Sequence, residues 1–182
     1  MKLGIVITSY NDEDTLERAI KSAANLKKKN KIYIVLVDDC SNDSTLKIAK
    51  HAKENNQIDL IHSNKKNLGV SNCRNIGINL CLSTDYITFL DADDCLYSDL
   101  SKIIGKKNIH ADLVAFNFDY FYKNNVGKNK FYNEERTLEI TDIKKYFYNY
   151  LEKPNKNLLF TTCWSKLYKT KLLVSNKSLY FN

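Results

Sequence analysis

Four short apolar runs, separated by stretches of helical periodicity, dominate the first two-thirds of the chain. The runs are residues 3–7, 32–37, 58–61 and 86–90. Their length and their content of Ile, Val and Leu are typical of strands that are buried on both faces of a sheet. Between the runs, apolar residues recur every three or four positions, which indicates amphipathic helices. This order predicts an α/β fold with a mostly parallel, Rossmann-like sheet and helices on both faces.

The last third of the chain is less regular. Residues 120–132 are polar and aromatic, which indicates a hairpin or an excursion from the sheet. The apolar spacing predicts a helix that Thr141 caps and that ends at Leu151. Residues 161–168 are expected to form a strand or a turn. We therefore divide the chain into an α/β core at residues 1–118 and a second region at residues 119–182.

Polar side chains gather at three of the predicted strand ends. The clusters are Thr8-Ser9-Tyr10-Asn11, Asp38-Asp39 and Asp91-Ala92-Asp93-Asp94. In open α/β sheets, ligands bind beyond the carboxyl ends of the strands. Clustered carboxylates repel one another, and a bound cation relieves that repulsion. We therefore expect a shared ligand crevice at this edge, with Asn11 and Asp43 serving only to cap the helices that follow them.

The residue types in this crevice suit a phosphorylated ligand that carries an aromatic base. Tyr10 offers a ring face on which a base can stack, and Asp39 can accept hydrogen bonds from a base or a ribose. Asp91 and Asp93 can hold Mg²⁺ or Mn²⁺ together with phosphate oxygens. Arg74 can neutralise a diphosphate through charge-assisted hydrogen bonds. Each residue also has a purely structural interpretation: a surface ring, a carboxylate that holds a turn, or a surface ion pair.

Composition and missing motifs argue against several other classes of protein. The formal net charge is +7, but the lysines are scattered among asparagines, which favours a solvated surface, or attraction to an anionic membrane, over a nucleic-acid interface. Neither GxGxxG nor GxxxxGK(S/T) occurs, so neither the usual dinucleotide site nor a P-loop is expected. Five cysteines without a CxxC pair indicate free thiols in a reducing compartment. No signal peptide and no apolar run near the ~20 residues of a membrane span occurs, so we expect a cytoplasmic protein.

Four segments, taken in order, resemble the family 2 glycosyltransferases of the GT-A fold. They are Ile5-Val6-Ile7-Thr8-Ser9-Tyr10-Asn11, then Val35-Leu36-Val37-Asp38-Asp39-Cys40-Ser41-Asn42-Asp43-Ser44-Thr45, then Asn67-Leu68-Gly69-Val70-Ser71-Asn72-Cys73-Arg74-Asn75-Ile76-Gly77, then Phe89-Leu90-Asp91-Ala92-Asp93-Asp94. The resemblance covers residues 3–120 and implies an inverting transferase that uses a nucleotide-diphosphate sugar, with UDP as the expected nucleotide. Cys40 stands where the family often has glycine, and Ser9 where proline or valine is frequent, but neither change removes a charged contact.

The resemblance also implies a role for each matching residue. Thr8 and Tyr10 would frame the base, Asp39 would bind it, Asp91 and Ala92 would lie by the ribose, Arg74 would lie near the diphosphate, and Asp93 would ligate Mn²⁺ or Mg²⁺. Residues 1–118 would then bind the nucleotide sugar, and residues 119–182 would begin the side that binds the acceptor. The acceptor would be a glycan or a lipid-linked glycan of a bacterial surface polysaccharide, reached at the inner face of the membrane.

The general base is the residue that the resemblance does not supply. Residues 163–169 match an element after which family members usually carry a catalytic Glu-Asp pair, and no acidic residue follows Glu152. Inverting transfer needs a base for the acceptor hydroxyl, so we expect that base to lie beyond Asn182 and this chain to transfer sugar poorly. Asp119 and Asp142 are remote alternatives for this role.

Two other hypotheses remain open from the sequence. The first is a non-catalytic module that binds a nucleotide sugar or serves as a scaffold, which the missing base would favour. The second is a sugar nucleotidyltransferase, whose sheet is similar. That chemistry calls for a glycine-rich, arginine-bearing loop after the first strand, and the residues at 8–11 do not form one.

Overall fold

The computed structural model describes residues 1–106, 109–122, 125–129, 137–153, 158–175 and 181. The strands are β1 (Lys2–Ser9), β2 (Lys31–Asp38), β3 (Leu60–Ser63), β4 (Tyr86–Asp91), β5 (Leu113–Ala115), β6 (Phe118–Tyr122), β7 (Asn125–Asn129) and β8 (Lys166–Lys169). The helices are α1 (Leu16–Lys27), α2 (Thr45–Glu54), α3 (Val70–Leu80), α4 (Leu100–Ile104), α5 (Ile140–Glu152), α6 (Leu158–Thr161) and α7 (Thr170–Ser175).

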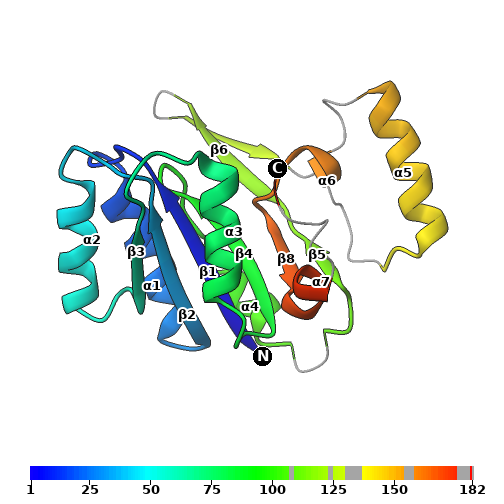
Figure 1. The fold of residues 1–182 in the computed structure, drawn as a ribbon. Coiled ribbons are helices and arrows are strands. Elements are labelled where there is room, and N and C mark those ends of the chain that lie inside the picture. Colours follow the sequence, from blue (N-terminus) through cyan, green and yellow to red (C-terminus); the bar gives the residue numbers. More distant parts are fainter. Residues whose placement is uncertain (107–108, 123–124, 130–136, 154–157, 176–180, 182) are drawn as a thin grey trace.

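In this part of the chain, six strands form the main sheet in the order β3-β2-β1-β4-β8-β5 (Figure 1). Neighbouring strands from β3 to β4 run parallel, as the alternation of strands and helices predicts. Strand β1 lies between β2 and β4, so the order of the strands reverses at its carboxyl end. That reversal is where open α/β sheets bind their ligands.

Strand β8 is the one antiparallel member of the described main sheet, and it lies between β4 and β5. Its pairs include Ile87 with Tyr168 and Val114 with Leu167. The sequence indicated a strand or turn here but not its insertion into the sheet. Strand β8 belongs to the predicted second region of the chain but pairs within the sheet of the first region. The division at residue 118 stays a prediction.

Alternating side chains of β1 supply both faces of the core. Leu3, Ile5 and Ile7 pack with apolar residues of α1 and α2, whereas Val6 packs with α3 on the other face. Figure 1 shows α3 in front of the sheet and α1 behind it. A Cβ atom at Gly77 of α3 would lie 2.2 Å from a methyl carbon of Val6, so glycine lets this helix approach the sheet closely.

Several predicted element ends are wrong by a few residues. Asn11 does not cap α1: its φ is 56°, and its side chain accepts the Asn42 N–H, while α1 begins at Leu16. The Asp12 carboxylate accepts both the Ser9 hydroxyl and the Tyr10 N–H, which favours a turn over an earlier helix start. Asp43 accepts the N–H of Thr45, the first residue of α2, but it also accepts the Glu13 N–H, and Ser44 is the N-cap, so the prediction that Asp43 only caps this helix is wrong.

The remaining differences have similar local causes. Strand β3 begins at Leu60 instead of residue 58, because Ile58 is buried in the core from the turn before the strand. A capping box formed by Glu139 and Asp142 starts α5, so Thr141 is not the cap. Of the two alternatives for residues 120–132, the structure has the hairpin, as the antiparallel pair β6 and β7, while residues 123–124 and 130–132 lie outside the described residues. Within the described residues, none of the helices combines the length and the apolar character that crossing a bilayer requires.

Candidate functional site

Parallel register brings three of the predicted clusters to one edge of the sheet. Ser9 at the end of β1 is paired with Asp38 at the end of β2, and Thr8 is paired with Asp91 at the end of β4. The Asp39 N–H donates to the Ser9 carbonyl over 2.9 Å, which joins the first two clusters directly. The polar groups at the strand ends therefore form a single neighbourhood.

Asp91 is the centre of the direct contacts at this edge. It accepts a hydrogen bond from the Arg74 guanidinium at 2.8 Å and one from the Thr8 hydroxyl at 3.3 Å. The two charged side chains are only 13% and 28% exposed, so water screens their attraction less than it would on an open surface. Three residues predicted separately, on β1, α3 and β4, thus meet in one cluster.

Arg74 keeps hydrogen-bonding capacity beyond this ion pair. Its Nε is buried and has no partner within the described residues, and its guanidinium carbon lies 5.6 Å from the centre of the Phe181 ring. An arginine that is nearly buried, charged and incompletely hydrogen bonded is suited to receive an anionic ligand.

Asp39 is engaged within the protein itself. Its carboxylate is buried and accepts hydrogen bonds from the Asn64 amide and from the Leu68 and Gly69 N–H groups, each at 2.8 Å. Burial raises the pKa of Asp39, but these hydrogen bonds outweigh it and hold the pKa below its usual range. The carboxylate thereby fixes the loop that leads into α3, which carries Arg74.

The loop after β4 presents the remaining acidic groups. The Asp93 side chain is exposed and has no partner within the described residues. The pKa of Asp94 is raised by burial of its carboxyl group and by the negative charges of Asp93 and Asp91, while Arg18 opposes that shift. The carboxylates therefore lie close enough to repel one another, which is the condition a bound cation would relieve.

Whether this loop suits a divalent cation can be judged from its donors. Within the described residues, no group of three or more His, Cys, Asp or Glu side chains has the arrangement of a metal site. Asp91 is already paired with Arg74, whereas Asp93 and Asp94 are exposed and have no side-chain hydrogen bond or ion pair within the described residues, so these two carboxylates are left for a cation. One carboxylate fits Mg²⁺ or Mn²⁺ when phosphate oxygens and water complete the shell.

Two other predicted site residues have less specific surroundings. Tyr10 is 47% exposed, beside the ends of β1 and β2, as a stacking platform requires. Ala92 is buried in the core cluster, and its methyl side chain offers no polar group to a ligand.

The structure also adds Arg18, which sequence reasoning missed. Its guanidinium donates to the Asp93 carbonyl at 2.7 Å and so ties α1 to the acidic loop. No motif marked this residue, because its partner is a backbone atom 75 residues away.

Neither remote alternative for the general base has a free carboxylate. Asp142 accepts the Glu139 N–H in the capping box of α5. Asp119, on β6, is hydrogen bonded to Tyr97 and, after burial, contributes to raising the pKa of that phenol. Tyr97 lies just beyond the acidic loop, so the β6–β7 hairpin approaches the site, but Asp119 is engaged there as a partner of Tyr97.

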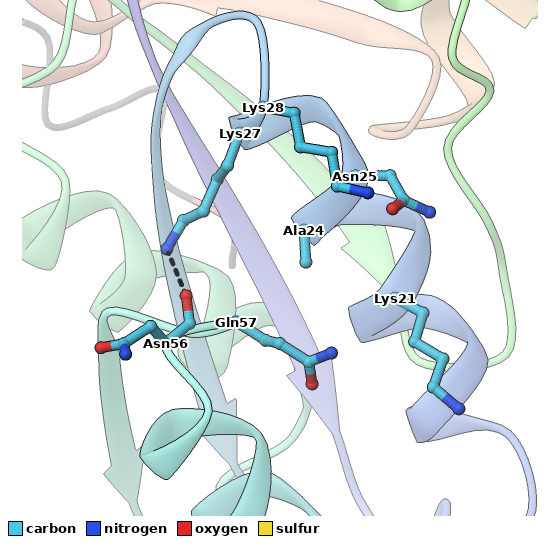
Figure 2. A pocket seen from close by; sticks show the side chains of 7 residues that line it. All are labelled: Lys21, Ala24, Asn25, Lys27, Lys28, Asn56 and Gln57. Carbon is cyan, nitrogen blue, oxygen red and sulfur yellow. Dashed lines mark hydrogen bonds between the residues drawn. The ribbon is translucent and has the colours of Figure 1, made fainter.

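A hollow of about 390 Å³ lies elsewhere, between the end of α1 and the turn after α2 (Figure 2). Its lining includes Lys21, Lys27 and Lys28. Lys21 is paired with Glu17 and Lys27 with Asp59, so much of the positive charge is already compensated. The hollow lies near the amino ends of β2 and β3, whereas the acidic loop follows the carboxyl end of β4. The hollow is therefore not part of the candidate site.

Comparisons with known proteins agree with this geometry. The family model described as Glycosyl transferase family 2 matches residues 4–174. Over 182 aligned residues the chain is 30% identical to the cholesterol galactosyltransferase of Borreliella burgdorferi, covering 96% of this chain and 50% of that protein. It is also 30% identical to the glycosyltransferase GlyA of Streptococcus pneumoniae, covering 94% of this chain and 25% of that protein. The chain thus spans half or less of the length of these relatives.

Among solved structures, residues 1–349 of Staphylococcus aureus TarS superpose with a TM-score of 0.74 at 23% identity, covering 100% of this chain and 50% of that one. The same TarS fragment has been solved with UDP and with UDP-GlcNAc. At this identity the likeness speaks for the fold alone, and it confirms the predicted GT-A fold. The match of the family model over residues 4–174 is decisive for the family: the chain belongs to glycosyl transferase family 2.

Proposed function

We propose that this chain is the donor-binding part of an inverting glycosyltransferase that uses a nucleotide-diphosphate sugar, with UDP as nucleotide and Mn²⁺ or Mg²⁺ as cofactor. The observation that carries the proposal is the cluster of Thr8, Arg74 and Asp91 at the sheet edge, next to the partnerless carboxylate of Asp93. Cationic, anionic and hydroxyl groups meet there at the place where an α/β sheet binds phosphorylated ligands.

Each side chain has a role that its surroundings support. The exposed ring of Tyr10 stacks on the base. Thr8, whose hydroxyl donates to Asp91, frames the base together with Tyr10. Asp39 shapes the base site through the loop at residues 64–69, and any contact of its own with the base would use its remaining acceptor capacity. Asp91 and Ala92 lie by the ribose.

Arg74 and Asp93 serve the diphosphate. The Arg74 guanidinium carries terminal N–H groups beyond the one that pairs with Asp91, and it can donate one to a phosphate oxygen while it keeps Asp91 as a partner. Asp93 holds the cation, which, when bound, stabilises the negative charge on the departing diphosphate. Arg18 keeps the acidic loop in place through the Asp93 carbonyl.

The proposal also assigns a part of the chain to the acceptor. We place the beginning of the acceptor region at residues 119–182, and the acceptor is a glycan or a lipid-linked glycan at a membrane surface. We assign the general base to none of the described residues, because Asp119 and Asp142 are engaged in other contacts. In the absence of such a base, the chain would bind the donor without transferring its sugar at a useful rate.

Titration calorimetry of UDP with and without Mn²⁺ tests donor binding. We expect affinity to fall at least about tenfold when the metal is chelated, because the cation links the diphosphate to Asp93. Equal affinity in both conditions would contradict a metal-linked donor site.

The alternative is a non-catalytic nucleotide-sugar-binding or scaffolding module, which the engaged carboxylates of Asp119 and Asp142 favour. Product analysis with a UDP-sugar and candidate acceptors separates it from an enzyme. Turnover by the 182-residue chain would reject the module and would point to a base among its own residues.

A further inference from the structure

Asn75 joins helix α3 to a backbone segment 106 residues further along the chain. Its amide nitrogen donates to the Phe181 carbonyl at 2.7 Å, and its amide oxygen accepts the Phe181 N–H at 2.9 Å. The side chain therefore satisfies both backbone groups of one residue, as a neighbouring strand would. Two hydrogen bonds with fixed directions leave Phe181 little freedom to rotate or slide against the helix.

The ring of Phe181 is placed by this attachment. It meets the buried ring of Phe89 edge to face, with centroids 5.2 Å apart, and Phe89 in turn packs against Tyr168 of β8. The guanidinium of Arg74, the residue before Asn75, lies 5.6 Å from the centre of the Phe181 ring. Phe181 thus fills the space between the core and the arginine of the candidate site.

The Phe181 ring beside Arg74 strengthens the attraction of the guanidinium for an anionic ligand. Arg74 has Asp91 on one side, yet its Nε remains buried without a partner in the described part of the chain. An aromatic face attracts a guanidinium, and it also excludes water that would otherwise screen the charge. A guanidinium held between a carboxylate and a ring is less free to turn away from an incoming anion.

We propose that Asn75 is a positioning residue for the donor site: by holding the Phe181 backbone, it sets the Phe181 ring against Arg74 and so fixes the guanidinium for the β-phosphate of the nucleotide. The inference rests on the proposed function for the identity of the ligand. The contacts among Asn75, Phe181 and Arg74 do not depend on it, so positioning and binding can be tested separately.

Positioning is tested first without any nucleotide, by NMR of the arginine Nε–H groups. The chain contains three arginines, at positions 18, 74 and 136, so an Arg74→Lys variant assigns the Arg74 signal. We expect Asn75→Ala and Phe181→Leu to move that signal away from its ring-shifted position, and Phe181→Tyr to keep it. A signal that stays in place in Asn75→Ala overturns the proposal, whether or not nucleotide binds.

Binding is then measured by calorimetry with UDP and with UMP, both in the presence of Mn²⁺. We expect Asn75→Ala to weaken UDP binding about fivefold to tenfold and UMP binding less than about twofold, because only UDP carries the phosphate that Arg74 receives. Phe181→Tyr should keep the wild-type ratio of the two affinities, because it retains the aromatic ring beside Arg74. A loss of equal size for both nucleotides would show general damage to the helix and would contradict positioning.

Asn72→Ala is the matched control. Asn72 lies on the same helix, and its amide donates to the Leu68 carbonyl without touching Phe181. It should leave both the Arg74 signal and the ratio of UDP to UMP affinity unchanged. If wild-type protein binds neither nucleotide, the donor proposal fails, while the NMR comparison still decides whether Asn75 positions Arg74.

Discussion

Arg74 and Asp91 are joined by a 2.8 Å ion pair that links helix α3 to the end of β4. The ion pair makes Asp91 less available to a metal ion than the unpaired carboxylates of the loop, because a carboxylate bound to a guanidinium is a poorer ligand for a second cation. Asp91 is held by Arg74, whereas the Asp93 side chain is exposed and lacks such a partner among the described residues, which is why we propose Asp93 as the ligand of the cation. Two acidic residues that are equivalent by sequence thus have different surroundings.

The first prediction concerns the stability that this pair contributes. Asp91→Ala should lower the free energy of unfolding by about 1–3 kcal/mol, because it leaves a nearly buried guanidinium without its anion. Urea denaturation measures the change. Asp112→Ala is the control, since its pair with Lys169 is largely exposed and should contribute less than about 1 kcal/mol. Equal losses in both variants would mean that burial does not strengthen the Arg74–Asp91 pair.

The second prediction concerns the metal. Asp93→Asn should remove most of the dependence of UDP affinity on Mn²⁺, because an amide oxygen carries no net charge to hold the cation. Calorimetry over a series of Mn²⁺ concentrations measures this dependence. Asp99→Asn changes an exposed carboxylate nearby that pairs with Lys102, and it should behave like wild type. If Asp93→Asn retains the full metal response, the cation is held by other groups.

The third prediction concerns Lys166, which is buried in β8 and donates to the carbonyls of Thr162 and Trp164. Burial lowers its pKa from the usual 10.5 to about 8. Between these two values the unfolded chain binds more protons than the folded chain, so stability rises with pH; below about pH 8 the cost of the buried charge is fully present.

Comparison with Lys166→Met isolates this contribution. The free energy of unfolding of wild type should rise relative to the variant by about 1–3 kcal/mol between about pH 7.5 and about pH 10. In the variant, the carbonyls of Thr162 and Trp164 lose the Lys166 donor. This loss shifts the difference in free energy of unfolding by a constant amount and does not change how that difference depends on pH. A difference that stays constant over this range would show that Lys166 titrates as an exposed lysine does.

The fourth prediction uses the backbone at Cys40, whose φ of 68° is in the left-handed region. Glycine adopts this conformation without a steric penalty, although it gives the unfolded chain more freedom. Cys40→Gly should therefore raise the free energy of unfolding by up to about 1 kcal/mol. Cys95→Gly is the comparison, because Cys95 is exposed and does not have a positive φ. Cys95→Gly should leave the free energy of unfolding unchanged or lower it. If Cys95→Gly raised that free energy as much as Cys40→Gly does, the positive φ of Cys40 would not explain the gain.

The sequence identified those parts of the fold whose signals are local. Strands β1, β2 and β4 are continuous apolar runs, and the acidic residues after β4 stand directly at a strand end. Parallel pairing then brings these ends together, so the neighbourhood of Thr8 and Asp91 could be predicted. Helix starts were less certain, because Asp12 competes for the backbone groups that a cap at Asn11 would have organised.

Contacts between distant residues could not be predicted in this way. Asn75 lies in one of the four segments that resemble the family, but no local signal predicts its two hydrogen bonds to Phe181, which lies 106 residues further along the chain. The same holds for the three hydrogen bonds of Asp39, which follow from the path of the loop at residues 64–69. Such contacts need the assembled sheet before their partners are defined.

Strand β8 is synthesised well after β4, the strand with which it pairs. Residues 2–91 leave the ribosome first, and they can pair β1 with β2 and β4 while one side of β4 still lacks its neighbour. Only when residues 166–169 emerge does that side gain a partner and the link to β5 form. An open strand edge is a template for pairing with other chains. A nascent chain that pauses between these two stages would therefore depend on chaperones to shield β4 from aggregation.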